Sequence, residues 1–152
     1  MKIYVDADGC PAAIIEILSK AVFRKQIYMV LVANHLKKGN WSDFVSSVVV
    51  PEGPDVADDR IIELMSKGDL VITTDIPLAS RVVEKRGFAL NPRGELYTEE
   101  NIAQKLSVRN FMDELRGTGV DTGGPSSFSN KHKQAFSHAL DRFLAKSHNS
   151  DS

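Results

Sequence analysis

Short apolar runs alternate with longer amphipathic stretches along the chain, and this alternation is the main structural signal. Uninterrupted apolar runs predict buried strands, whereas apolar residues that recur at helical spacing predict helices. Strands are predicted at residues 3–5, 27–33, 45–50, 70–74 and 88–90. Helices are predicted at residues 11–24, 55–67, 76–86, 98–115 and 131–146. Strands that alternate with helices favour a mostly parallel sheet of about five strands covered by helices on both faces, which is a three-layer α/β domain.

The remaining segments of the sequence give no sign of a second domain. Residues 117–130 are rich in Gly, Ser and Pro, which predicts a loop that is either a flexible tether or an ordered substrate loop. The pattern shows no internal repeat and no second domain. We therefore expect one domain over residues 1–146, followed by a polar, disordered tail over residues 147–152.

Composition narrows the class of protein. The chain has 152 residues, of which 42% are hydrophobic and 26% charged, as in ordinary globular domains. It has no apolar run approaching the ~20 residues that span a bilayer, and Met1 and Lys2 lead directly into an acidic strand rather than a signal peptide. The lone Cys10 excludes an internal disulfide and has no evident base beside it, so we expect it to pack rather than react. A cytoplasmic protein with no membrane contact and no disulfide partner is expected.

Two carboxylates follow the first predicted strand. The apolar run at residues 3–5 leads directly into Asp6 and Asp8. Ionised oxygens are costly to bury unless they are paired or bound to metal. At the carboxyl edge of a parallel sheet, however, they would face the crevice in which open α/β folds bind ligands. The alternative for Asp8 is that it only caps the following helix.

Two further acidic segments are predicted to reach the same edge. Asp58 and Asp59 lie in the first turn of a helix, where the helix dipole alone could explain them. Asp75 ends the apolar run at residues 70–74 and could be only an N-cap. Two parallel strands that both end in Asp nevertheless bring their acids together, and the Thr73 and Thr74 hydroxyls could add contacts. Hard oxygen ligands of this kind suit Mg²⁺ or Mn²⁺.

Potential substrate contacts lie in the second half of the chain. Arg93 and Arg116 each neighbour a glycine, and arginine matches phosphate well. Gly124 would offer an exposed backbone N–H group, and the Phe128 ring could stack on a base. Because the formal net charge is only −1, the chain as a whole does not attract nucleic acid. RNA binding would have to come from this local set of residues, with the acids neutralised by metal.

Several motifs in combination resemble the YaiI/YqxD family of bacterial proteins. They occupy residues 4–11, 53–59, 68–79, 91–94 and 123–125. The resemblance implies a PIN-like fold, related to that of metal-dependent ribonucleases, without an established activity. By position it implies a metal site formed by acids of the first strand, a middle helix and the fourth strand. These acids are Asp6, Asp58 or Asp59, and Asp75, with Asp8 as a fourth. Arg60 stands where the resemblance would place an aromatic residue.

Three functional hypotheses remain open at this point. The first is a Mg²⁺- or Mn²⁺-dependent ribonuclease whose catalytic acids are Asp6, Asp8, Asp58, Asp59 and Asp75. The second is a non-catalytic PIN-like domain that binds RNA or a protein, since fold does not fix function. The third is a haloacid-dehalogenase-like phosphatase with Asp6 as nucleophile and Asp8 as general acid. Against the third, Asn34 follows the next strand where Ser or Thr would be expected.

Overall fold

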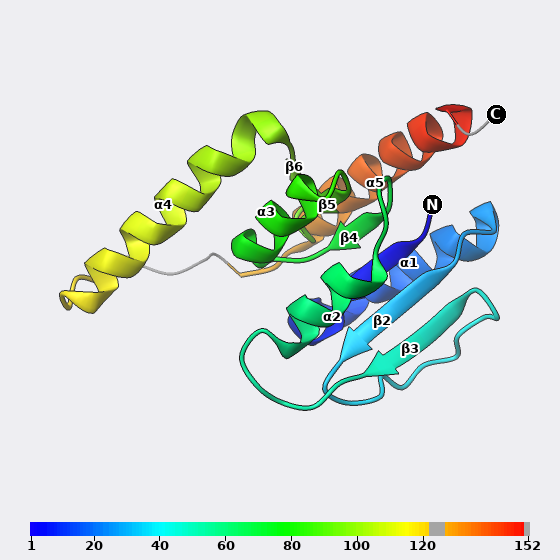
Figure 1. Ribbon diagram of the computed structural model, residues 1–152. Helices are drawn as coiled ribbons and strands as arrows, with labels where there is room; N and C mark the ends of the chain where they lie inside the picture. Colours follow the sequence, from blue (N-terminus) through cyan, green and yellow to red (C-terminus); the bar gives the residue numbers. More distant parts are fainter. Residues whose placement is uncertain (122–126, 151–152) are drawn as a thin grey trace.

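The computed structural model describes residues 1–121 and 127–150, and it describes side chains as far as residue 146. Five α-helices and six strands are found in these residues, together with a 3₁₀ turn at Ala7–Gly9. The strands are β1 (Ile3–Asp6), β2 (Met29–Ala33), β3 (Val45–Val49), β4 (Leu70–Ile72), β5 (Phe88–Leu90) and β6 (Leu96–Tyr97). The helices are α1 (Ala12–Lys25), α2 (Val56–Leu64), α3 (Ile76–Glu84), α4 (Glu99–Gly117) and α5 (Asn130–Ser150). Figure 1 shows their arrangement.

The strands form one sheet in the order β3-β2-β1-β4-β5-β6. All neighbouring pairs are parallel except β5 and β6, which are antiparallel. The predicted three-layer α/β class is therefore confirmed, with β6 as a sixth strand that the apolar pattern did not reveal. Because β6 contains only two residues, it is too short to show an alternating pattern.

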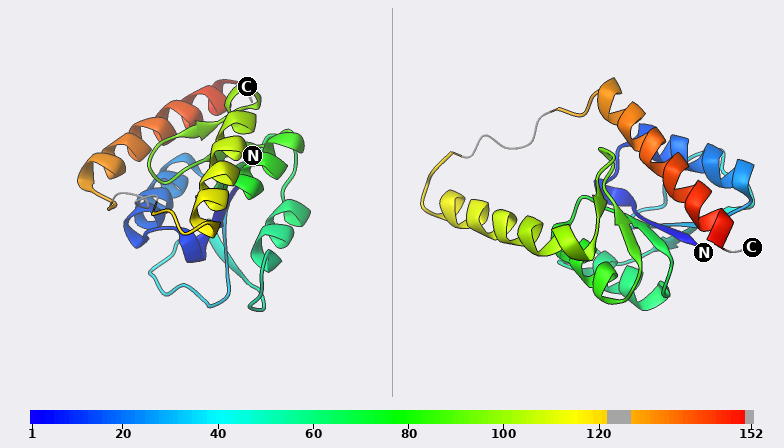
Figure 2. Two further views of the ribbon diagram at one scale, coloured as in Figure 1. Left: turned by 90° about the vertical axis from the view of Figure 1, so that its left-hand side faces the viewer. Right: turned by 90° about the horizontal axis from the view of Figure 1, so that it is seen from above.

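Alternate residues of β1 enter different hydrophobic cores, as strand geometry requires. Ile3 and Val5 pack into a core that includes residues of α1 and α5, whereas Tyr4 packs into a core with residues of α2 and α3. In the right-hand view of Figure 2, α1 and α5 accordingly lie on one side of the sheet, with α2 and α3 on the other. The Asp6 side chain, one position beyond Val5, points to the α2 and α3 side.

Helix α2 ends at Leu64, three residues before its predicted end, for a local reason. The side chain of Asp69 is buried and accepts hydrogen bonds from the backbone N–H groups of Ser66 and Lys2, both at 2.9 Å. These bonds hold the chain in a turn that leads into β4, so residues 65–69 cannot continue the helix. The Tyr4 hydroxyl donates to the Leu64 carbonyl at 3.1 Å and satisfies the helix end.

Helix α4 projects away from the body of the domain (Figures 1 and 2). It is well capped: the Thr98 hydroxyl accepts the Asn101 N–H, and the Asn101 side chain accepts the Thr98 N–H. Ile102 is nevertheless the only buried residue of α4, all of which the structure describes. Toward its far end, Val108 and Phe111 are 50% and 57% exposed. The free half of α4 thus carries apolar side chains on its surface.

The end of α5 differs from the prediction. The backbone of α5 is helical to Ser150, beyond the predicted helix end at residue 146, and residues 151–152 lie outside the described part of the chain. Among the residues that the structure describes, no helix is both long enough and apolar enough to cross a membrane.

Candidate functional site

The central strands β1 and β4 define the position of the site. They lie side by side in the sheet, and their following helices α1 and α3 cover opposite faces. The chain direction across the sheet therefore reverses at this pair of strands, and such switch points form the crevice in which α/β sheets bind ligands. Asp6 is the last residue of β1, and Thr73 follows β4 directly. Both side chains thus belong to the carboxyl edge at the crevice.

Thr73 connects Asp6, which ends β1, with Asp75, which follows β4. Its hydroxyl donates to Asp6 Oδ2 at 2.9 Å and accepts the backbone N–H of Asp75 at 3.0 Å. The Thr73 residue is only 1% exposed, so this arrangement is shielded from water and rigid. The sequence predicted hydroxyl contacts from both Thr73 and Thr74 and assigned Thr74 to the substrate; Thr74 is exposed, and its hydroxyl lies close to Gly9. Thr73 therefore orients the acids, while Thr74 faces the solvent.

Asp75 is the N-cap of α3. Its Oδ1 atom accepts the backbone N–H of Leu78 at 3.0 Å, and a proline follows within the first turn of the helix. The capping alternative considered for Asp75 is thus observed. It does not remove Asp75 from the crevice, because the same carboxyl also shares a hydrogen bond with Asp58.

Asp58 brings a third carboxyl to this place from helix α2. Burial, followed by the negative charges of Asp75 and Asp6, raises the pKa of Asp58 from 3.8 to about 7. Burial is also the first cause of a raised pKa at Asp6, to which the charges of Asp75 and Asp8 add and which the Thr73 hydrogen bond opposes. We call Asp6, Asp58 and Asp75 the acidic cluster. Near neutral pH the cluster retains a proton on Asp58 for part of the time.

The other two predicted acids lie outside this cluster. Asp59 forms an ion pair with Arg81 of α3 at 2.8 Å and is largely exposed. Asp8 accepts the backbone N–H of Asn34 at 2.7 Å and pairs with Lys37 at 3.4 Å. Asp8 therefore ties the start of the β2–β3 loop to the crevice. It does not cap α1, whose N-cap residue makes no side-chain hydrogen bond.

The acidic cluster offers a cation oxygen atoms only, which suits Mg²⁺ and Mn²⁺. In the described part of the chain, however, no three His, Cys, Asp or Glu side chains are already arranged to hold a metal ion. Burial and the charges of Asp75 and Asp6 raise the pKa of Asp58 to about 7, so near neutral pH this carboxyl carries a proton for part of the time. A cation would have to replace that proton.

Cys10 lies beside the crevice without being activated. Burial and the charge of Asp6 raise the pKa of the Cys10 thiol to about 12, and Lys37 opposes this only in part. The side chain is partly buried against the α1 and α5 core. The expectation that Cys10 packs rather than reacts agrees with this environment.

Of the residues predicted to contact substrate in the second half of the chain, the structure brings only Arg93 and Phe128 near each other, through His132. Arg93 lies in the turn between β5 and β6, where its Nη1 atom is 3.4 Å from Nε2 of His132. The ring of Phe128 is 5.6 Å from the His132 ring. Arg116, in contrast, pairs with Asp113 near the far end of α4, and Gly124 lies outside the described residues. His132 was not assigned a role from sequence, because nothing in the local pattern marks its contact with a turn 39 residues away.

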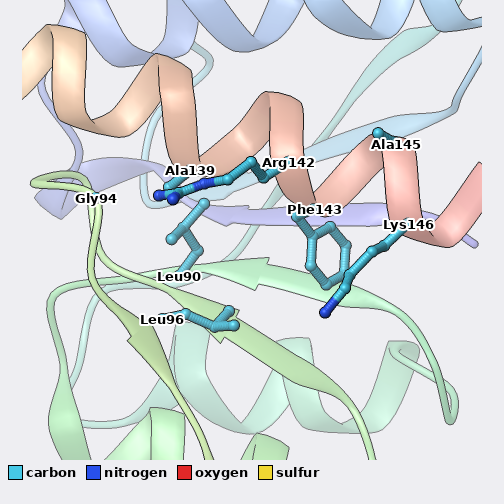
Figure 3. A pocket seen from close by; sticks show the side chains of 8 residues that line it. All are labelled: Leu90, Gly94, Leu96, Ala139, Arg142, Phe143, Ala145 and Lys146. Atoms are coloured by element: carbon cyan, nitrogen blue, oxygen red, sulfur yellow. The ribbon is translucent and has the colours of Figure 1, made fainter.

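A separate cavity of about 420 Å³ lies between the β5–β6 hairpin and α5 (Figure 3). Leu90, Leu96 and Phe143 point into it, and Arg142 and Lys146 extend along its rim. None of the described lining residues is acidic. This cavity is therefore distinct from the crevice that holds the acidic cluster.

The fold and the site together define a class: a three-layer α/β domain with three carboxyls at the switch point of a mostly parallel sheet. Within that class, residues 4–146 match the family described as "Uncharacterized BCR, YaiI/YqxD family", and the chain belongs to this family. The resemblance inferred from the motifs is thereby confirmed.

Curated relatives support the same assignment over nearly the full length. A UPF0178 protein of Shewanella pealeana is 54% identical over 148 residues, which cover 97% of this chain and 98% of the relative. A UPF0178 protein of Syntrophotalea carbinolica is 54% identical over 146 residues, covering 96% and 99%. One of Janthinobacterium sp. is 53% identical over 146 residues, covering 96% and 97%. No solved structure gives a significant match to the chain.

Proposed function

We propose that the protein is a Mg²⁺- or Mn²⁺-dependent phosphodiesterase that hydrolyses RNA. The observation that carries the proposal is the placement of Asp6 and Asp75 at the carboxyl edge of the neighbouring strands β1 and β4, where both are hydrogen-bonded to Thr73. Burial and the charges of Asp75 and Asp6 also raise the pKa of Asp58 to about 7. Carboxyls held together in this way repel one another once they ionise. A divalent cation would relieve that repulsion, and the switch point of a parallel sheet is where such a ligand is expected.

The three carboxyls of the acidic cluster differ in how each side chain is held and in whether it must lose a proton before a cation binds. Asp6 is held by the buried Thr73 hydroxyl, and Asp75 is held by the first turn of α3. Asp58 carries the exchangeable proton, and a carboxyl must lose its proton before it can bind metal. These three residues would hold the ion, which when bound would activate water and neutralise charge on the phosphate oxygens.

Other residues would orient the substrate. The exposed hydroxyl of Thr74 lies next to Gly9, whose lack of a side chain leaves space beside it. This hydroxyl can donate a hydrogen bond to a phosphate oxygen near the cluster. Arg93, in the turn that follows the neighbouring strand β5, would supply a positive charge to the same strand of RNA. The RNA would then be bound by a hydroxyl donor and by a guanidinium group.

The direct test is cleavage of a labelled RNA oligonucleotide by the full chain with Mn²⁺, with Mg²⁺ and with EDTA. Asp6→Asn and Asp75→Asn should each lower the metal-dependent rate by about 10² or more, the order of magnitude seen when one electrostatic contact to the transition state is lost. Glu63→Gln is the matched control, because Glu63 is an exposed residue of α2 whose carboxylate forms an ion pair with Arg60. Circular dichroism verifies that each variant is folded. Unchanged cleavage in both aspartate variants refutes the assignment.

The remaining hypotheses predict different results in the same experiment. A non-catalytic RNA-binding domain would bind the oligonucleotide and cleave it with neither ion. A dehalogenase-like phosphatase would hydrolyse phosphomonoesters and form an aspartyl phosphate at Asp6, which mass spectrometry detects. The hydrogen bond from Thr73 to Asp6 is compatible with either chemistry.

A further inference from the structure

The hairpin of β5 and β6 presents apolar side chains to α5 that the helix covers only in part. Leu90 belongs to the core that includes residues of α5, and Leu96 is its cross-strand partner, so both point to the same face of the sheet. Phe88, two residues before Leu90, points to that face as well. Leu90 is only 1% exposed, whereas Leu96 and Phe88 are 37% and 41% exposed. The apolar face of the hairpin therefore continues beyond the part that α5 covers.

Two contacts hold the hairpin and α5 together on either side of the cavity between them. Near the tip of the hairpin, Gly94 lies so close to α5 that a Cβ atom there would be 2.7 Å from the carbonyl of Ala135. Further along the helix, the rings of Phe88 and Phe143 pack edge to face, with 5.1 Å between their centroids. Between these contacts α5 presents only the methyl group of Ala139 to the cavity of about 420 Å³. The cavity is therefore a built feature of the fold, bounded by fixed contacts.

The rim of the cavity carries positive charge. Arg142 and Lys146 extend along it from α5, and no acidic residue is found among the described residues that line it (Figure 3). The Arg142 side chain forms neither a hydrogen bond nor an ion pair with any residue that the structure describes. The neighbouring acid, Asp141, pairs instead with Arg24 of α1 at 3.5 Å. The Arg142 guanidinium can therefore donate to an anion at the mouth of the cavity.

We propose that this cavity binds a small amphipathic carboxylate, with one carboxylate group and an aliphatic body of about six to ten carbon atoms. The cavity volume of about 420 Å³ is at the lower end of the ~300–1,000 Å³ of small-molecule sites, which suits a ligand of this size. Binding in the cavity needs neither the acidic cluster nor a metal ion, so it is independent of the proposed phosphodiesterase activity.

The chemistry of the lining favours this class of ligand. The aliphatic body would displace water from Leu90, Leu96 and the Phe143 ring, which point into the cavity. The carboxylate would accept hydrogen bonds from Arg142, whose planar guanidinium matches a carboxylate in geometry. Apart from Arg142 and Lys146, the lining side chains are apolar, so a ligand with a polar body would lose hydrogen bonds with water on entry.

The first test locates the ligand. Octanoate is titrated into the full chain in EDTA, and the backbone amides are followed by ¹H–¹⁵N correlation spectroscopy. The signals of Leu96, Ala139 and Phe143 should shift together and saturate. Those of Val108 and Phe111, exposed apolar residues of the projecting helix α4, should stay in place and provide the internal control. No shift at the cavity, or equal shifts along α4, would overturn the site, because an amphiphile that binds apolar surface unspecifically does not distinguish the two places.

The second test examines which ligand chemistry the cavity prefers, by calorimetric titration. From hexanoate through octanoate to decanoate, the affinity should rise about fourfold for each CH₂ group that enters the cavity. Octan-1-ol and octyltrimethylammonium have the same chain without the negative charge, and both should bind more weakly than octanoate. Equal affinity across the carboxylate series, or binding of either octyl compound as strong as that of octanoate, refutes the proposed ligand class.

Matched variants separate the charge of the rim from the apolar lining. Arg142→Gln should weaken octanoate binding about threefold to tenfold, as expected for a solvent-screened contact to a charged group, and should leave the affinity for octan-1-ol unchanged. Arg142→Lys should retain most of the affinity for octanoate. Leu96→Ser should weaken the binding of both ligands, because it removes apolar surface from the cavity.

The same two types of substitution on α4 provide the controls. Arg109→Gln and Val108→Ser change an exposed charge and an exposed apolar side chain away from the cavity, and neither should alter the affinity. Circular dichroism verifies that each variant is folded. Unchanged octanoate binding in both Arg142→Gln and Leu96→Ser, or an equal loss in the α4 variants, overturns the proposed site.

Discussion

Replacing Asp58 by Asn removes a carboxyl whose ionised form is destabilised by burial and by the charges of Asp75 and Asp6. The pKa of Asp58 lies at about 7 in the folded protein, against 3.8 ordinarily. Between these two values the folded state binds more protons than the unfolded state, so the contribution of Asp58 to stability falls as pH rises. At about 1.36 kcal/mol per pH unit, the ceiling for this loss is about 4 kcal/mol. Asp58 is half-exposed, and solvent screening reduces the expected loss to about 1–2 kcal/mol.

Asp58→Asn should therefore be more stable than the wild type at pH 8, by about 1–2 kcal/mol, and close to it at pH 4. For a chain of this size, that gain corresponds to a rise in Tm of about 2–8 °C at pH 8. Urea and thermal unfolding in EDTA, followed by circular dichroism at both pH values, measure the difference. Asp59→Asn is the comparison, because it removes only the exposed ion pair with Arg81 and should not stabilise at either pH. A loss of stability in Asp58→Asn at pH 8, or the same change at both pH values, refutes the reasoning.

Two further predictions concern the surroundings of the site. Gly94→Ala should destabilise the protein by about 1–3 kcal/mol in thermal unfolding, because Gly94 has a φ of +94° and its new Cβ would meet the backbone of Ala135; unchanged stability would contradict the close contact with α5. Cys10 should react with iodoacetamide at pH 8 on the order of 10³-fold more slowly in the native protein than in urea, because its pKa is about 12 in the fold. Equal labelling rates in the two states would show that the thiol is neither buried nor beside Asp6.

The sequence predicts where the acidic edge of the sheet lies better than it predicts which acidic residues belong to it. Asp6 ends β1 and Asp75 follows β4 by three residues, and these two strands are neighbours, because apolar runs locate strands well and parallel strands share one carboxyl edge. The choice of Asp58 over Asp59 depends on helical phase: Asp58 lies one turn before the buried Ile61, whereas Asp59 is turned toward α3. That phase could have been read from the apolar residues of the helix.

Contacts between distant segments could not be predicted in the same way. The apposition of Arg93 and His132 requires the hairpin turn to dock on α5, and that docking depends on a missing side chain at Gly94. A glycine in a turn has many explanations, so its sequence position does not identify the partner helix. The projection of α4, which separates Arg116 from the crevice, likewise follows from tertiary packing that the strong cap at Thr98 does not reveal.

The proton on Asp58 and the proposed metal compete for one place, and this competition gives the last prediction. Metal requires the ionised carboxyl, and the pKa of Asp58 is about 7. The affinity for Mn²⁺ should therefore fall by up to about tenfold for each pH unit below 7 and level off above pH 8. Calorimetric titration at pH 6, 7 and 8, in buffers of different ionisation enthalpy, measures both the affinity and the proton released. Asp58→Asn should bind more weakly and release no proton at this step. Binding of equal strength at pH 6 and 8, without proton release, would mean that Asp58 is not a ligand of the metal.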